Sequence, residues 1–152
     1  MFAGREVDYW SGKQIPGRQT IAVDVALDRL PLYVRAGSIL AKIPEDVMTL
    51  VPADQYSDKG VKSMDNRRVY EIYPGASAKL ESIHDFEDRV IEPGGEPGTL
   101  TITGAPAHII LRWRFAGPRA ATVDGRSVQV LHTADGSSVE FDHTDRTALS
   151  WR

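Results

Sequence analysis

Proline and glycine interrupt this chain so often that long regular elements have little room to form. The 152 residues include nine prolines and thirteen glycines, residues that end helices or shape tight turns. Between them lie short runs rich in Val, Ile, Thr, Tyr and Trp, which favour strands. About ten such runs at a spacing of roughly 8–12 residues predict an all-β chain of the β-sandwich class.

The expected strands are short apolar or alternating runs between turn signals. Residues 20–25 place Ile21, Val23 and Val25 on one face. The other expected strands are residues 32–35, 38–40, 68–73, 100–103, 108–115, 121–123, 126–130, 139–141 and 148–151. Between two of them lies Asp124-Gly125, the favoured residue pair for a type I′ hairpin turn.

Composition excludes several classes of function. A formal net charge of -3 without a run of like charges gives no basic face to displace counterions from nucleic acid. The absence of cysteine excludes a disulfide scaffold and thiolate metal sites. The sequence holds no phosphate-binding loop, dinucleotide fingerprint or nucleophile elbow. We therefore expect no nucleic-acid partner and no cofactor.

The beginning of the sequence does not resemble a leader. Residues 1–8 carry Arg5, Glu6 and Asp8 without an apolar core segment, so we expect no signal peptide. No run approaches the roughly 20 apolar residues that cross a bilayer. These observations predict a soluble chain with no membrane partner, and a cytoplasmic location is the one that we favour.

Three ordered strings in the first third of the chain are more specific than its composition. Residues 8–13 read DYWSGK, residues 20–23 read TIAV and residues 30–40 read LPLYVRAGSIL. They resemble the segment that follows the catalytic barrel in family 31 glycoside hydrolases, which include α-glucosidases and α-xylosidases. The resemblance implies a structural role for the matching positions, which are Asp8, Tyr9, Trp10, Gly12, Pro31, Arg35 and Gly37.

The second half of the chain resembles the distal C-terminal domain of the same family. Residues 69–75 read VYEIYPG and residues 86–88 read FED. Two positions depart from the family pattern, because Arg89 follows Asp88 where a second Asp is usual and Glu6-Val7 stand where a Trp is usual.

The resemblance implies a division of the chain into two β units. Residues 1–50 would be the C-terminal part of a proximal β-sandwich, and residues 67–152 would be a small distal β-sandwich. Residues 51–66, which are polar and turn-prone, would connect them.

The catalytic barrel of the family, with its nucleophilic Asp and its acid/base Asp, has no counterpart in this sequence. Retaining glycosidases need two carboxylates about 5–5.5 Å apart across the sugar. The acidic residues here lie in polar segments where turns and caps explain them, namely Asp54, Asp58, Asp65, Asp85, Glu87 and Asp88. Residues 63–66 share only composition with the nucleophile motif. We therefore expect a non-catalytic accessory region that is inactive alone.

One cluster has the composition of a metal site. It consists of His84, Asp85, Glu87 and Asp88. Oxygen ligands would suit calcium, but we expect an exposed acidic turn and no metal.

The alternative function is an independent carbohydrate-binding module. Such sandwiches present aromatic rings to the apolar faces of sugars, and the candidate rings are Tyr9, Trp10 and Trp151. Trp113 shares a strand face with Leu111, which indicates core packing.

The expected strand at residues 32–35 contains one charged side chain. Arg35 lies in an apolar strand, so we expect its guanidinium to make a fixed contact of several hydrogen bonds with a carboxylate or with backbone carbonyls, in a structural role. A partial sandwich leaves an open sheet edge, which the catalytic barrel of a parent enzyme or a second copy of the chain would cover. The sequence is equally compatible with a fragment and with a stand-alone protein whose sandwich has reorganised.

Overall fold

The computed structural model describes residues 5–46, 67–73, 80–85 and 88–152. The prediction of an all-β chain is confirmed, because the described residues form fourteen strands and no helix. With no helix in these ranges, there is none that is long and apolar enough to span a membrane. The expected connection at residues 51–66 lies outside the described residues.

Eleven of the strands form a β-sandwich, and one of its two layers is a five-stranded sheet. Its order is β12-β13-β9-β5-β4, and β5 and β9 are parallel whereas the other neighbours are antiparallel. The strands are β4 (Ile39–Lys42), β5 (Arg67–Ile72), β9 (Ala107–Arg114), β12 (Leu131–Thr133) and β13 (Gly136–His143).

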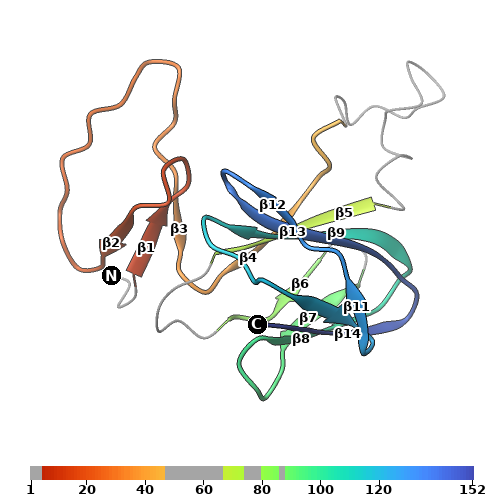
Figure 1. Ribbon diagram of the computed structural model, residues 1–152. Coiled ribbons are helices and arrows are strands. Elements are labelled where there is room, and N and C mark those ends of the chain that lie inside the picture. Colours follow the sequence, from red (N-terminus) through yellow and green to blue (C-terminus); the bar gives the residue numbers. More distant parts are fainter. Residues whose placement is uncertain (1–4, 47–66, 74–79, 86–87) are drawn as a thin grey trace, which may run out of the picture.

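The opposite face is an antiparallel six-stranded sheet in the order β11-β10-β14-β8-β7-β6. Its strands are β6 (Ile83–His84), β7 (Val90–Pro93), β8 (Thr99–Thr103), β10 (Ala121–Val123), β11 (Arg126–Val128) and β14 (Arg146–Trp151). The two sheets lie face to face (Figure 1). β10 and β11 are joined at Asp124 and Gly125, both with positive φ, so the predicted type I′ turn is confirmed.

The sandwich core consists of alternate residues from both sheets. β9 contributes Ile109, Leu111 and Trp113, while Leu100 and Ile102 come from β8 on the opposite sheet. The alternation of buried and partly exposed residues along β9 follows the period of two that places successive side chains on opposite faces of a strand. The core position predicted for Trp113 and Leu111 is confirmed.

A separate three-stranded sheet lies beside the sandwich (Figure 1). It has the order β2-β1-β3 and is antiparallel, with strands β1 (Arg5–Asp8), β2 (Gln14–Pro16) and β3 (Tyr33–Arg35). A second, smaller core forms where it meets the sandwich, around Val7, Ala36 and Tyr73.

The expected strand at residues 20–25 is wrong. Residues 19–32 form a long loop between β2 and β3 with no strand in it, and Ile21, Val23 and Val25 are all exposed. The alternating pattern is present, but a strand needs a hydrogen-bonded neighbour. No other strand of the described residues pairs with this segment.

The proposed boundary between the two β units stays a prediction. Strand pairing does link them, because β4 joins the five-stranded sheet through β5. Residues 39–42 therefore lie in the same sheet as the strands of the second unit.

Candidate functional site: the joint between the small sheet and the sandwich

The DYWSGK string forms the turn between β1 and β2. The Asp8 carboxylate accepts hydrogen bonds from the Trp10 and Ser11 backbone N–H groups at 3.2 and 2.7 Å and from the Ser11 hydroxyl at 2.7 Å. These bonds, led by that of the Ser11 hydroxyl, lower the pKa of Asp8. An Asp that bonds the backbone two and three residues ahead stabilises a tight turn. Asp8 is therefore a turn residue.

Gly12 completes the turn and sets its contact with the sandwich. Its φ is +72°, a conformation that residues with a Cβ rarely adopt. A Cβ at this position would lie 2.5 Å from ring atoms of Phe115, just after β9. Glycine thus allows both the turn and the close approach of the sandwich.

Tyr9 and Trp10 point in different directions from this turn. Tyr9 stacks on Tyr73 with ring centroids 6.2 Å apart, so it belongs to the joint. Trp10 is 45% exposed, but its indole N–H donates to the Leu30 carbonyl at 2.9 Å and Arg29 lies over its ring. Trp10 therefore fastens the long loop to the turn.

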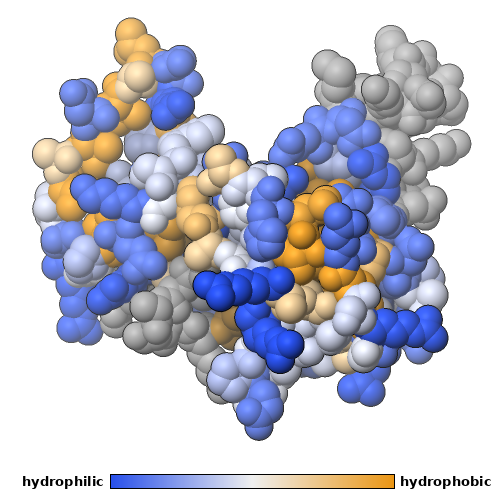
Figure 2. Space-filling model, in the orientation of Figure 1, coloured by the Kyte–Doolittle hydropathy of each residue, from blue (hydrophilic) through white to orange (hydrophobic). Residues whose placement is uncertain are grey.

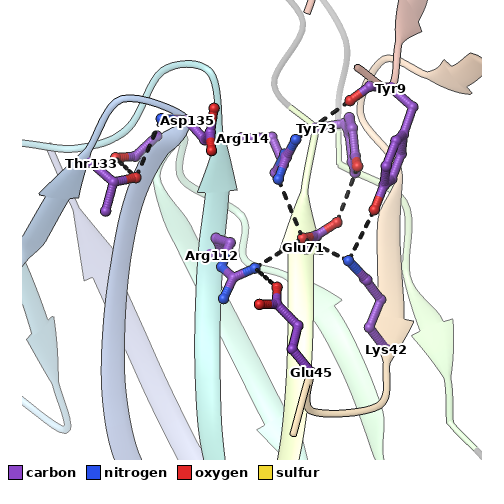
Figure 3. Close-up of polar contacts among 10 residues, drawn as sticks. Tyr9, Lys42, Glu45, Glu71, Tyr73, Arg112, Arg114, Thr133 and Asp135 are labelled. Carbon is purple, nitrogen blue, oxygen red and sulfur yellow. Dashed lines mark hydrogen bonds and ion pairs between the residues drawn. The ribbon is translucent and has the colours of Figure 1, made fainter. Parts of the chain in front are cut away.

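A buried carboxylate lies at the centre of the joint. The Glu71 side chain on β5 is 0% exposed, and Lys42, Arg112 and Arg114 approach its Oε1 at 3.1, 3.4 and 3.7 Å. The Tyr73 hydroxyl donates to Oε2 at 3.1 Å. Figure 3 shows these side chains converging from β4, β5 and β9. We call Glu71 with these four residues the Glu71 cluster.

Tyr9 connects the turn to the Glu71 cluster. The Lys42 ammonium donates to the Tyr9 hydroxyl at 3.0 Å, and the Arg114 guanidinium donates to the Tyr9 carbonyl at 3.4 Å (Figure 3). Burial alone would lower the pKa of Lys42, but the hydrogen bond to Tyr9 and the Glu71 carboxylate outweigh it and raise that pKa. Burial and the same carboxylate raise the pKa of the Tyr73 phenol. Lys42 therefore stays charged and Tyr73 stays protonated near neutral pH.

The Glu71 cluster holds structure together and is unsuited to hydrolysis. Glu45 reaches Arg112 at 2.9 Å, so two carboxylates share one guanidinium. However, Glu71 has no exposed surface and its oxygens already face three cations and a phenol. A catalytic carboxylate must contact the sugar, and this one is enclosed by protein.

The LPLYVRAGSIL string forms the link from the small sheet to the sandwich. Gly37 has a φ of +89°, and the Ser38 N–H donates to the Arg35 carbonyl at 3.1 Å, which is a type II turn between β3 and β4. Pro31 lies in the exposed loop before β3. Arg35 meets the carboxylate of Glu81 at 2.9 Å, with the two side chains 52% and 49% exposed. Among the described residues this is a single ion pair at the surface and not the expected multi-bond contact, so it contributes little.

The expectation of an exposed acidic turn is wrong for Asp85, whose side chain is 1% exposed. Asp85 and Arg89 are buried and paired at 3.1 Å, and the Tyr70 hydroxyl donates to Asp85 at 2.6 Å. Arg89 also donates to the carbonyls of Ala105 and Pro106. Glu87 lies outside the described residues, and within the described ranges no three His, Asp or Glu side chains are placed to hold a metal ion. The departure from the family pattern at Arg89 thus supplies the partner of Asp85.

The remaining candidate, Trp151, lies far from the joint in sequence and belongs to another part of the fold. It is partly buried at the end of β14, edge-on to Trp113 with ring centroids 5.3 Å apart. The structure therefore brings Tyr9 and Trp10 together but places Trp151 on the six-stranded sheet.

Known proteins resemble this chain in sequence and in fold. No family model matches the chain. An α-xylosidase of Saccharolobus solfataricus is 32% identical over 78 residues, which are 51% of this chain and 9% of that enzyme. The cycloalternan-forming enzyme of Listeria monocytogenes, solved with a pentasaccharide substrate, covers 98% of this chain with 16% of its own at 19% identity and a TM-score of 0.67.

The chain resembles the C-terminal β-sandwich region of a family 31 glycoside hydrolase. An ER glucosidase II complex gives a further match, covering 97% of this chain and 20% of its own at 12% identity and a TM-score of 0.52. This chain thus spans a small part of each relative, so the family 31 resemblance applies to an accessory region and not to a whole enzyme.

Sequence reasoning missed the Glu71 cluster although a signal for it existed. Glu71 interrupts the apolar run of residues 69–73, and Arg112 and Arg114 alternate with the core residues of β9. A charge inside an apolar strand needs a partner. The family resemblance singled out Arg35, which lies at the surface. The buried charge of the joint is Glu71, in the later segment VYEIY.

Proposed function

We propose that this chain is the non-catalytic C-terminal accessory region of a family 31 α-glycosidase, whose parent enzyme hydrolyses α-glycosidic bonds. The observation that carries the proposal is that a small part of a much longer carbohydrate enzyme covers nearly the whole chain. The motif residues of the family resemblance support it, because Asp8, Gly12 and Gly37 form turns rather than a reaction centre.

The role that the joint supports is to hold one sheet rigidly against another. Tyr9 stacks on Tyr73 while Lys42 and Arg114 tie it to a buried carboxylate. Three cationic groups from two strands converge on Glu71. An arrangement of this kind fixes the position of the small sheet relative to the sandwich.

The partner of the accessory region is a catalytic barrel. Residues 19–32 expose apolar side chains, which are Ile21, Val23, Val25, Leu27, Leu30 and Leu32. Figure 2 shows apolar surface gathered over the part of the molecule where this loop lies, at upper left. Exposed apolar surface on this scale is typical of an interaction site. The loop would pack on the barrel and on the strands next to it. The competing proposal is that a second copy of the chain covers this apolar surface.

The DNA sequence next to the Met1 codon tests the partner. The proposal expects coding sequence for a (β/α)₈ barrel with two catalytic carboxylates, either in frame with this chain or in a neighbouring gene. Neighbouring DNA that encodes no barrel would contradict it. The chain would then cover its apolar loop in another way, and light scattering would report dimers if a second copy does so.

Carbohydrate binding by an independent module is the second candidate function. The observation that favours it is the exposed ring of Trp10, which lies next to the ring of Tyr9. Calorimetry with maltose, isomaltose and xylosyl sugars separates the two candidates. Binding that Trp10→Ala abolishes would favour the module, whereas no heat of binding would leave the accessory role.

A further inference from the structure

Residues 19–26 have the pattern of a strand but no neighbouring strand to pair with. The chain runs from residue 19 to residue 26 without a turn or bend, in the loop that reaches away from the small sheet in Figure 1. No backbone hydrogen bond joins residues 19–25 to another described residue. The N–H and C=O groups of this segment are therefore open to a strand from outside the chain.

The side chains of the segment alternate between an apolar and a polar face. Ile21, Val23 and Val25 share one face and are 38%, 44% and 39% exposed. The positions between them, on the other face, are Thr20, Ala22 and Asp24. A partner strand with the same alternation would extend the apolar face and remove part of it from water.

The small sheet can support such a pair of strands. A hollow of about 350 Å³ lies between the segment and the β1–β2 hairpin, where Ile15 and Tyr33 line it together with Ile21 and Val23. A two-stranded ribbon alone is marginally stable in water and needs apolar packing on one face. The residues around this hollow supply that packing.

The sequence favours one antiparallel register of the segment with a second copy of itself. Directly opposite residues project to the same face, so apolar positions must lie opposite apolar positions. A register centred on Val23 places Ile21 opposite Val25 and Val23 opposite its own counterpart. A register centred on Asp24 would instead place two carboxylates directly opposite each other, which is destabilising.

Charges at the ends of the segment agree with the register centred on Val23. That register places Arg18 of one copy opposite Asp28 of the other, at both ends of the pair. A register centred on Ala22 would place Arg18 opposite the methyl group of Ala26. Within the described part of the chain, neither Arg18 nor Asp28 forms an ion pair. Both charges are thus available to a second copy.

We propose that residues 19–26 pair with the same segment of a second copy of this chain, in a two-fold symmetric antiparallel ribbon centred on Val23. Backbone hydrogen bonds join the two copies along the ribbon. The apolar side chains of both copies lie on one face of it, and an ion pair between Arg18 and Asp28 closes each end.

This inference goes beyond the proposed function, although it uses the loop that the proposed function assigns to the barrel. A docked barrel and a second copy would exclude each other, so the pairing applies to the chain without a barrel. It needs only two copies of residues 18–28 and is tested on the chain alone. Since neighbouring DNA tests the barrel, failure of one proposal is distinguishable from failure of the other.

Introduced cysteines test the register, because the chain has none of its own. In Val23→Cys the two cysteines are directly opposite, where Cα atoms lie about 4.5–5.5 Å apart and a disulfide fits. In a glutathione redox buffer we expect most of this variant to become a covalent dimer, with a band at twice the 16.8 kDa of the chain on a non-reducing gel.

Two neighbouring positions give the opposite result when used singly. In Ala22→Cys and in Asp24→Cys, the two cysteines of a dimer are diagonal to each other at roughly 7–8 Å, which is too far for a disulfide. Each variant alone should stay monomeric on the gel. A mixture of the two should cross-link, because residue 22 of one copy is opposite residue 24 of the other.

Leu27→Cys is the control for random collision. Leu27 is 109% exposed and lies in the same loop, so its cysteine is more accessible than that of Val23→Cys. In the proposed register residue 27 is opposite residue 19, and the two cysteines are far apart. We expect no covalent dimer from this variant under the same conditions.

A charge exchange tests the ends of the ribbon by sedimentation equilibrium. Asp28→Arg places two guanidinium groups opposite each other and should weaken the dimer by roughly two- to thirtyfold, because each dimer contains two such surface pairs. Adding Arg18→Asp to the same chain restores opposite charges and should restore the affinity of the parent chain.

Four outcomes would overturn the proposal. They are a parent chain that is strictly monomeric, cross-linking of Leu27→Cys as fast as that of Val23→Cys, cross-linking of Ala22→Cys as complete alone as in the mixture, and no recovery in the charge-exchanged chain. The first removes the second copy and the second makes the contact non-specific. The last two contradict the register centred on Val23.

Discussion

Two structural requirements select glycine at position 12, and the sequence motif alone does not distinguish them. Its φ is positive, and the space that a Cβ would occupy is filled by the ring of Phe115. Gly125 in the β10–β11 turn has nearly the same φ of +76°, but nothing lies within 4 Å of a Cβ there. The two glycines therefore allow the cost of the backbone conformation to be measured apart from the cost of the contact.

Gly12→Ala should lower the free energy of unfolding by about 2–5 kcal/mol, the sum of the left-handed backbone and overpacking costs. Gly125→Ala should lower it by about 1–2 kcal/mol, the backbone cost alone. Urea denaturation of both variants gives the comparison. Equal losses of unfolding free energy in the two variants would mean that the turn shifts to make room for the added methyl group, so that its contact with Phe115 contributes nothing.

His143 makes the stability of the sandwich depend on pH. It is buried, its Nε2–H donates to the Gly104 carbonyl at 3.2 Å and its Nδ1 accepts from the Thr147 hydroxyl at 2.8 Å. Burial lowers its pKa below the ordinary value of 6.5. Below that pH the unfolded chain binds a proton that the folded chain does not, so stability is complete above it and is lost as pH falls towards the folded-state pKa.

His143→Gln should therefore be less sensitive to acid than the parent chain. Its urea midpoint should change less between about pH 7.5 and pH 5, because the titrating group is gone. His84→Gln, at an exposed histidine, serves as the control and should follow the parent. Parallel pH profiles for the parent chain and His143→Gln would contradict this account.

At the scale of strands, two ion pairs show how burial changes the value of the same chemistry. Glu71 is enclosed by cations from β4 and β9, whereas Glu81 meets Arg35 at the surface. Removing one partner of a buried pair leaves the other charge buried without a counter-charge, which destabilises the fold strongly. Removing one partner of a surface pair costs little stability, because water solvates the charge that remains.

Glu71→Ala should lower the free energy of unfolding by about 3–5 kcal/mol, whereas Glu81→Ala should change it by about 1 kcal/mol or less. Thermal or urea denaturation of the two variants measures the difference. Similar small losses would show that Lys42, Arg112 and Arg114 are solvated without Glu71, and the joint would not depend on it.

Strand positions could be predicted where a strand's own residues determine its place. β9 and β14 bury alternate residues, and the alternation is visible in the sequence. β1 and β2 were missed because charged residues and a proline hide their pairing. The reverse error occurred at residues 20–25, where the pattern is present but the described residues supply no partner strand. Pairing partners are a tertiary property, so local pattern cannot supply them.

The sequence indicated the turn residues of the candidate site but not its buried charges. The turns at Gly12 and Gly37 lie within the motif strings. Glu71, Arg112 and Arg114 come from strands that are neighbours only after the parallel pairing of β5 with β9. Nothing in their spacing along the chain indicates that they meet.

At the scale of the whole molecule, the loop at residues 19–32 should make the isolated chain associate. Leu27, Leu30, Val23 and Ile21 are exposed, and contiguous exposed apolar surface promotes association. Replacing these four residues with Ser should lower the binding of a fluorescent apolar dye and the apparent mass in light scattering. A parent chain that is strictly monomeric and binds no dye would contradict this prediction.

Hydrolysis is the most direct test of the central claim that this accessory region has no reaction centre of its own. The purified chain would be incubated with 4-nitrophenyl α-D-glucoside and α-D-xyloside across the pH range in which it is folded. The account predicts no release of nitrophenol above that of buffer. Release that survives repurification and is lost in Glu71→Gln or Glu45→Gln would contradict it.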